Sequence, residues 1–353
     1  MSFDLLKNMV SIPSFSREEE KVADYICRWL EEEALEYKRV GNNIILHKGC
    51  NIEGAPSILL SSHIDTVKPS PKYTFDPFNP PHTSDTIFGL GSNDAGGSVT
   101  AMLYTFKHFS KEDLPFSLGL ILSAEEECSG EGGIASLSGY ISENYDFAII
   151  GEPTLMKGAI GERGLLVLDG KASGKSGHAA RNEGINAIDI AIRDINRLQN
   201  FKFDKRSPSM GDIKLSVTQI NAGTQHNVIP DTCTFVVDIR TTEQYSSAEI
   251  WEMLQSITES ELTPRKLTNR SSATPQGHIL LEALEINSIE KFISPTTSDW
   301  MKINIPAVKM GPGDSARSHQ ADEYIYIKEI EEGIRGYTSY INTLGDLIRN
   351  GKY

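Results

Sequence analysis

The sequence has little cysteine and no long apolar run. Its four cysteines, Cys27, Cys50, Cys128 and Cys233, are widely scattered and form no paired metal-binding motif. Neither a disulfide framework nor a zinc finger is therefore expected, and any bound metal must be held by histidine and carboxylates. No apolar run approaches membrane-spanning length, and the first residues lack the basic and apolar regions of a signal peptide. We therefore expect a cytoplasmic protein.

Basic residues are also few relative to acidic ones. The chain has 34 Lys and Arg against 48 Asp and Glu, a net charge of -14 at pH 7. This surplus argues against nucleic acid or an anionic membrane as a partner, although an acidic protein can still bind metal cations. A length of 353 residues is too great for one ordinary core and suggests two domains. The sequence shows neither internal repeats nor low-complexity tracts.

The first candidate site residues follow a predicted buried strand. The apolar segment 58–60 runs on to His63 and Asp65, whose side chains share a face because alternate residues of an extended segment point the same way. A histidine and a carboxylate in this arrangement can form a metal ligand with its orienting partner, or only a hydrogen-bonded pair. The remaining acidic segments favour the metal site.

Those segments also follow predicted strands or loops. The irregular loop 69–93 leads to Asp94, which could simply cap the predicted helix 97–109, although the neighbouring glycines would also let backbone approach a ligand. The apolar strand 117–123 leads to three adjacent glutamates, which repel one another unless a cation neutralises them. Glu152 follows the next apolar strand. In an open α/β sheet, such strand ends converge on one crevice.

Residues 161–270 are predicted to form an inserted second domain, and residues 1–160 and 271–353 the main one. The insert combines three strand-like segments with two helical ones, and its clearest strand alternates apolar and polar residues. This pattern predicts a sheet with one face covered by two helices. The segment 263–275, rich in Pro, Thr, Ser and Arg, is interpreted as the return linker.

The main domain has predicted helices near both ends. Ser16 and Glu19 have the spacing of a capping box, and apolar residues then recur at helical intervals, so we predict a helix over residues 16–34. Beyond the insert we predict a strand over residues 305–310, a loop that contains His319 and a closing helix over residues 328–349.

Together these motifs resemble the metallopeptidase and amidohydrolase family of acetylornithine deacetylase, succinyl-diaminopimelate desuccinylase, aminoacylase and carboxypeptidase G. The resemblance spans nearly the whole chain and rests on motifs in order: His-x-Asp, Gly-x-Gly-x-x-Asp, the acidic triplet, Gly-Glu-Pro-Thr, Ser-Gly-His-Ala-Ala-Arg, His-Asn-Val-Ile-Pro-Asp, Asp-Ile-Arg and Gly-Pro-Gly-x5-His. It implies an α/β fold, in which a mixed-sheet, three-layer, two-metal peptidase domain carries a smaller inserted α+β domain of one sheet and two helices.

The resemblance also implies a set of metal ligands. Asp94 would bridge two metal ions, His63 and Glu152 would complete one site, and Glu127 and His319 would complete the other. Two divalent ions would be balanced by three ligand carboxylates and a bridging hydroxide, so the cluster would be neutral. Imidazole and carboxylate ligands without thiolate suit zinc, with cobalt or manganese as alternatives.

By the same resemblance, Asp65 would fix the tautomer of His63, and Glu126 would be the general base. The family usually shows Asp-Glu-Glu where this chain has Glu125, Glu126 and Glu127. A shift of one register would instead make Glu125 the base and Glu126 the ligand. We favour the first register because Ala124 matches the small residue that precedes the triplet in the family.

In the insert, the resemblance implies a homodimer in which His178 reaches the neighbouring subunit's active site and helps to stabilise the oxyanion. Asn227 and Arg240 resemble residues that bind the substrate's α-carboxylate. A turn amide and a strand-edge salt bridge are the alternative roles of these two residues. Asp299 matches a family loop near the cleft, and no role can be derived for it.

The expected function is that of a di-zinc amidohydrolase that removes the acyl group from a small N-acyl amino acid, most like acetylornithine deacetylase of arginine biosynthesis. Removal of a succinyl group from an ornithine-like or diaminopimelate-like substrate is an alternative, as is hydrolysis by a metal-dependent dipeptidase or carboxypeptidase. A catalytically silent metal-binding oligomer is the alternative outside the enzyme class.

Overall fold

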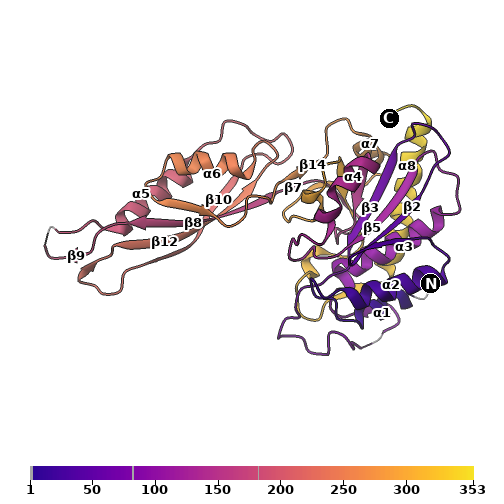
Figure 1. The fold of residues 1–353 in the computed structure, drawn as a ribbon, viewed down its shortest axis with the longest axis horizontal. Coiled ribbons are helices and arrows are strands. Elements are labelled where there is room, and N and C mark those ends of the chain that lie inside the picture. Colours follow the sequence, from indigo (N-terminus) through magenta and orange to yellow (C-terminus); the bar gives the residue numbers. More distant parts are fainter. Residues whose placement is uncertain (1–2, 82, 182) are drawn as a thin grey trace. The chain divides into compact units, whose positions relative to one another are not determined.

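The chain divides into two compact units in the computed structural model, which describes residues 3–81, 83–181 and 183–353 (Figure 1). The first unit comprises Met1–Ile160, Ala273–Phe292 and Ser298–Tyr353. The second comprises Gly161–Ser272 and Ile293–Thr297. The prediction assigned the short segment 293–297 to the main domain, whereas in the structure it belongs to the second unit.

The first unit is built around a nine-stranded sheet in the order β1-β2-β5-β3-β6-β16-β7-β14, with β15 paired to β7. Its strands are β1 (Lys38–Val40), β2 (Asn43–Lys48), β3 (Ser57–His63), β5 (Ser117–Ser123), β6 (Phe147–Ile150), β7 (Gly158–Glu162), β14 (Ser272–Ala273), β15 (Lys291–Ser294) and β16 (Ala307–Lys309). The central strands β5, β3, β6 and β16 run parallel, whereas β2 is antiparallel to β5. The sheet is therefore mixed, as predicted.

Helices cover both faces of this sheet. On β3, Ile58 and Leu60 pack into one apolar cluster and Leu59 into another, because alternate side chains point to opposite faces. The first cluster is covered by α1 (Asp4–Val10), α2 (Glu20–Glu32), α3 (Gly97–Phe109), α7 (Ile279–Ile286) and α8 (Ile327–Arg349). The second is covered by η2 (Ile134–Leu137), α4 (Ser138–Asn144) and η3 (Asp299–Lys302). The predicted three-layer arrangement is confirmed.

The predicted capping box at Ser16 and Glu19 is wrong. Helix α2 begins at Glu20 and ends at Glu32, and its N-cap residue, Glu19, makes no side-chain cap bond. The Ser16 hydroxyl instead donates to Asp65 at 2.7 Å. The Glu19 carboxylate accepts from the backbone N–H groups of Arg17 and Glu125. Both side chains are thus used to hold distant segments together rather than to start a helix.

The second unit contains a four-stranded antiparallel sheet in the order β10-β12-β8-β13. Its strands are β8 (Gly164–Ser173), β10 (Lys214–Ala222), β12 (Thr232–Thr241) and β13 (Glu261–Pro264), and its helices are α5 (Ala187–Asn200) and α6 (Ser247–Ser256). Along β12, Phe235, Val237 and Ile239 are buried in a core shared with both helices, while the residues between them are not. The predicted sheet with one covered face is confirmed.

Several short elements complete the two units. In the first unit, β4 (Thr86–Phe88) pairs with β17 (Tyr324–Tyr326), η1 (Ser92–Gly96) precedes α3, and η4 (Ser315–Arg317) precedes His319. In the second, β9 (Gly177–His178) pairs with β11 (Val228–Ile229). The segment 263–275 is not a plain linker, because it contains the end of β13 and all of β14.

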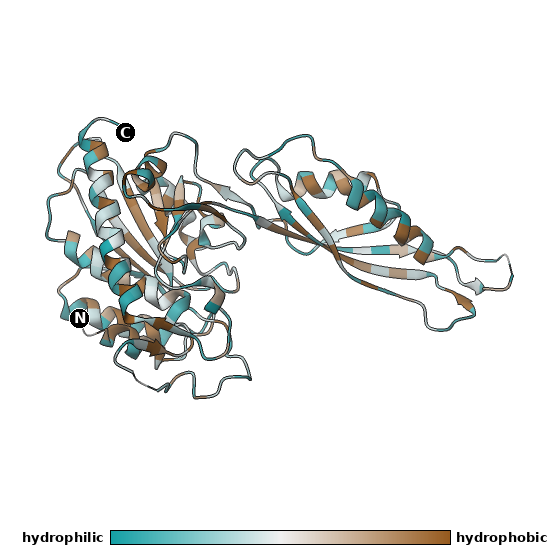
Figure 2. Cartoon of the chain, turned by 180° about the vertical axis from the view of Figure 1, so that it is seen from behind, coloured by the Kyte–Doolittle hydropathy of each residue, from teal (hydrophilic) through white to brown (hydrophobic). Residues whose placement is uncertain are grey.

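Hydropathy follows this architecture. In Figure 2, helices of both units carry hydrophobic and hydrophilic stretches side by side, as expected for helices with one face against a sheet. Among the described helices, none combines the length and apolar character needed to cross a membrane.

Candidate metal centre

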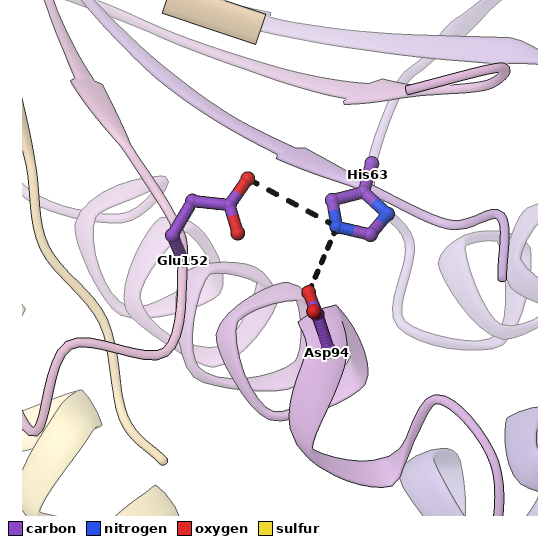
Figure 3. A group of neighbouring side chains, drawn as sticks. All are labelled: His63, Asp94 and Glu152. Atoms are coloured by element: carbon purple, nitrogen blue, oxygen red, sulfur yellow. Dashed lines mark hydrogen bonds and ion pairs between the residues drawn. The ribbon is translucent and has the colours of Figure 1, made fainter. Parts of the chain in front are cut away.

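His63 lies at the end of β3 and faces two carboxylates (Figure 3). Its Nε2 lies 3.2 Å from Asp94 Oδ1 and 4.0 Å from Glu152 Oε1. The histidine is 2% exposed, and its other ring nitrogen, Nδ1, lies 3.0 Å from the backbone oxygen of Asp65. Burial alone would lower the pKa of His63, but Asp65, Asp94 and the nearby carboxylates raise it well above its usual value.

A second group of ligating side chains shares Asp94 with the first. His319 Nε2 lies 2.9 Å from Glu127 Oε2 and 4.0 Å from Asp94 Oδ2. The hydrogen bond with Glu127 is the main reason that the pKa of His319 rises to about 9. Asp94 therefore presents one oxygen to each histidine, and the structure brings together all five predicted metal ligands.

The parallel strands explain why these residues meet. In the register of β3 and β5, His63 lies beside Ser123, so the acidic triplet follows directly beyond the same edge. Ser61 of β3 lies beside Ile150 of β6, which delivers Glu152 to that edge as well. Parallel strands end at one side of a sheet, so residues far apart in sequence converge there.

Asp94 reaches the group from η1, not as a helix cap. Helix α3 begins at Gly97 with Gly96 as its N-cap, and no side chain caps it. The Asn93 amide bonds both backbone groups of Asp314, which attaches η1 to the loop before His319. The predicted alternative of a capping carboxylate is therefore wrong.

Asp65 connects His63 to the acidic triplet. Its carboxylate accepts the backbone N–H of Glu126 at 3.0 Å and that of Glu127 at 3.1 Å. Its Oδ1 also lies 3.4 Å from His63 Nδ1. Burial raises the pKa of Asp65, but its partners, His63 first, outweigh burial and lower it. One buried carboxylate thus fixes both the imidazole and the backbone that carries two glutamates.

The glutamates of the triplet point in different directions. Glu125 has a left-handed backbone with φ of 55°, and its carboxylate accepts the N–H of Gly132, at a surface turn. Glu126 instead lies close enough to His63 and Glu152 to interact with both charges. Desolvation, and then the charges of Glu152, Asp299 and Glu127, raise the pKa of Glu126 well above its usual value.

Three buried charged residues near this group could not be assigned a role from the sequence. Asp299 accepts the Ser123 hydroxyl at 2.5 Å, and its pKa is raised to about 7, chiefly by desolvation. Lys309 in β16 is 2% exposed. Desolvation raises the pKa of Glu152 to about 8, and the charge of Lys309 opposes that rise. A lysine within an apolar strand is a signal that the sequence did contain. Glu323, 2% exposed, lies beside the loop of Asp94.

The donor set fits a pair of divalent ions. The ligand atoms within each three-residue group, His63 with Asp94 and Glu152, and Asp94 with Glu127 and His319, lie within 4.8 Å of one another. Ligands about 2.1 Å from a tetrahedral ion would be about 3.4 Å apart, so only small shifts are needed. A shared carboxylate between two such groups suits adjacent cations, whose charges would offset the repulsion among the acidic side chains.

The other predicted residues, His178, Asn227 and Arg240, belong to the second unit. His178 pairs with Val228 in the β9/β11 ribbon, and the Asn227 backbone oxygen accepts the N–H of Ala179. Both side chains are exposed. Arg240 donates to both oxygens of Asp238, at 2.8 and 3.1 Å, so the predicted alternative of a strand salt bridge is present.

Comparisons with known proteins identify the family. The model of peptidase family M20/M25/M40 matches residues 59–343. A succinyl-diaminopimelate desuccinylase of Xylella fastidiosa (strain 9a5c) is 27% identical over 363 residues, covering 93% of this chain and 94% of that protein. Such enzymes also occur among the other similar curated proteins, at 24% to 28% identity.

Solved structures show the same fold. The aminopeptidase PepT of Bacillus cereus has a TM-score of 0.76 at 16% identity and covers 97% of each chain. The YXEP protein of Bacillus subtilis, described as a dinuclear metal binding peptidase, has a TM-score of 0.71 at 18% identity and covers 98% of this chain and 97% of its own. The family match spans most of the chain, so this protein belongs to peptidase family M20/M25/M40 and is a metal-dependent amide hydrolase.

Proposed function

We propose that this hydrolase removes a succinyl group from the amine of an amino acid. The curated relatives named as succinyl-diaminopimelate desuccinylases support this substrate class, which was an alternative at the sequence level. Acetylornithine deacetylation, our first expectation, has no specific support and becomes the second candidate. Because the family assignment makes this protein a hydrolase, the catalytically silent alternative has no support.

The observation that carries the two-metal part of the proposal is the shared position of Asp94 between two donor groups. Asp94, His63 and Glu152 would hold one divalent ion, and Asp94, Glu127 and His319 the other. Zinc is the proposed metal, since the donors are imidazole and carboxylate, with cobalt or manganese as alternatives. When bound, such a pair polarises the scissile carbonyl and supplies a water that ionises near neutral pH.

Glu126 is proposed as the general base. It would accept the proton of the attacking water and later donate it to the leaving amine. The geometry supports Glu126 rather than Glu125, because Glu125 turns to the Gly132 N–H. Asp65 would favour the His63 tautomer with a proton on Nδ1, which leaves Nε2 free to act as a ligand.

Recognition of an anionic acyl group is supported by a cluster of cations in the second unit. Arg240, Lys214 and Arg163 line one open cavity of about 590 Å³. Lys214 and Arg240 are direct cross-strand neighbours, an arrangement that like charges disfavour unless an anion is nearby. Asp238 supplies part of that negative charge. A succinyl group brings a carboxylate that an acetyl group lacks, so this cavity favours the hypothesis of a desuccinylase.

Asn227 is proposed to join Arg240 in substrate binding, and His178 to stabilise the oxyanion in a partner subunit. A homodimer through the second unit is part of this proposal. Strand β10 lies at one end of its sheet, so its outer edge has no partner strand among the described residues. Two apolar side chains, Ile192 of α5 and Ile220 of β10, are more than half exposed, at 55% and 52%. An open edge with exposed apolar residues suits pairing with a second copy.

The test is amine release from a panel of substrates by zinc-loaded enzyme. The panel contains N-succinyl-diaminopimelate, N-succinylornithine, N-acetylornithine, N-acetylcitrulline and a dipeptide. The succinylated compounds should be hydrolysed with the highest kcat/KM. Preference for N-acetylornithine would replace the proposal with the second candidate, and preference for the dipeptide would make the protein a peptidase. Sedimentation of the same sample tests the dimer, and a monomer would remove the proposed role of His178.

A further inference from the structure

Glu323 makes an unusual set of contacts with the loop that carries Asp94. Its Oε1 accepts the backbone N–H of Asn93 at 2.8 Å and that of Asp94 at 2.9 Å. Its Oε2 accepts the N–H of Gly91 at 3.1 Å. One side chain therefore binds three of the four backbone N–H groups between residues 91 and 94.

These bonds supply acceptors that a helix does not offer to the N–H groups at its start. Gly91, with φ of 77°, is the N-cap of η1, and Asn93 and Asp94 lie in its first turn. Buried backbone N–H groups need an acceptor, and a carboxylate can serve several at once with charge-assisted bonds. Because one of the three donors is the N–H of Asp94 itself, Glu323 helps to fix the backbone position from which the Asp94 side chain extends.

The segment that contains Glu323 also carries His319, the histidine of the second donor group. Glu323 is four residues after His319. The strand that follows it, β17, pairs with β4, which precedes the Asp94 loop in the chain. The backbone oxygen of Glu323 accepts the N–H of Gly89 at 2.9 Å. Backbone and side chain of this one residue therefore attach the His319 segment to the Asp94 loop.

We infer that Glu323 is a positioning residue for the paired metal site: it holds Asp94 at the angle that serves both donor groups and couples it to the segment of His319. Glu323 itself is not a ligand. The inference rests on the proposed two-ion site and adds a residue to it that acts only through Asp94.

The experiment measures the dissociation constants of both zinc ions by competition with a chromogenic chelator. It uses the full chain, with the variants Glu323→Gln and Glu323→Ala. The amide of Glu323→Gln keeps the shape and one acceptor but turns a donor toward another N–H. Asp322→Asn is the matched control, because Asp322 is the adjacent carboxylate and accepts two bonds from Thr74 instead of the Asp94 loop.

Both dissociation constants should rise in Glu323→Gln, by about 10-fold to 100-fold as for other residues that orient metal ligands, and further in Glu323→Ala. Both should stay within about threefold of wild type in Asp322→Asn. A merely structural role would lower the melting temperature of the metal-free protein and leave the zinc affinities of Glu323→Gln unchanged, and that result would overturn the inference. Failure of the wild-type protein to bind two ions would overturn the two-ion site instead.

Discussion

The residues that hold the candidate site of the first unit in place are more buried than the candidate binding residues of the second. In the first unit, His63 and Asp65 are almost fully buried, and Asp65 and Glu323 accept five backbone N–H bonds between them from segments that carry ligands. In the second unit, His178 on a short ribbon and Asn227 directly before β11 are exposed. The candidate metal ligands of the first unit are thus held by buried backbone bonds, whereas the proposed recognition groups of the second unit are open to solvent.

The largest effect should come from the first unit. Glu126→Gln should lower kcat by about 10²–10⁴-fold, since the loss of a positioned general base typically costs that much. Zinc content should remain at the wild-type level, because Glu126 is not a proposed ligand. The matched variant is Glu125→Gln, whose side chain faces Gly132, and its kcat should change less than threefold. Equal losses in the two variants would contradict the assignment of the base.

In the second unit, Arg240→Ala should raise KM rather than lower kcat. Loss of hydrogen bonds to a charged group costs about 1.5–3 kcal/mol, or roughly 10-fold to 150-fold in KM for a succinylated substrate. Arg265→Ala is a close control, because Arg265 forms a similar two-bond pair with Asp169 on the same sheet but does not line the cavity. A similar rise in both variants would indicate that Arg240 has only a structural role.

The second unit also has a buried carboxylate that binds backbone, and we expect it to support stability alone. Asp194 accepts the N–H groups of Glu259 and Ser260 and the Ser260 hydroxyl. Asp194→Asn should destabilise the protein by about 1–3 kcal/mol at pH 7, without altering zinc affinity. Chemical denaturation of the two proteins would measure this difference, with the exposed Asp189→Asn as control.

The pH dependence of the same variant provides a second test. Burial alone would raise the pKa of Asp194, but Ser260, Glu259 and Arg197 outweigh burial and lower it. A carboxyl whose pKa is lower in the folded state stabilises the protein above its unfolded pKa, about 3.9, and that stability is lost as pH falls through the folded value. The difference between wild type and Asp194→Asn should therefore shrink below about pH 4. A constant difference down to pH 2 would contradict this account.

Much of this organisation was predictable from sequence because buried parallel strands are nearly continuous apolar runs. The strand ends at His63 and Glu152 could be placed from such runs alone, and the two-layered second unit from the alternation along residues 213–220. The capping box at Ser16 was wrong because a tertiary partner, Asp65, took the hydroxyl. Glu323 was missed for a similar reason, since its bonds join residues about 230 positions apart and leave no local pattern.

The central claim is that Asp94 joins two donor groups into one paired metal site, and zinc titration tests it most directly. Metal-free wild type should bind two zinc ions per chain, and His319→Ala should retain one of them at near wild-type affinity. Asp94→Ala should lose affinity for both. Fewer than two ions bound by the wild type, or two ions bound by Asp94→Ala at wild-type affinity, would contradict it.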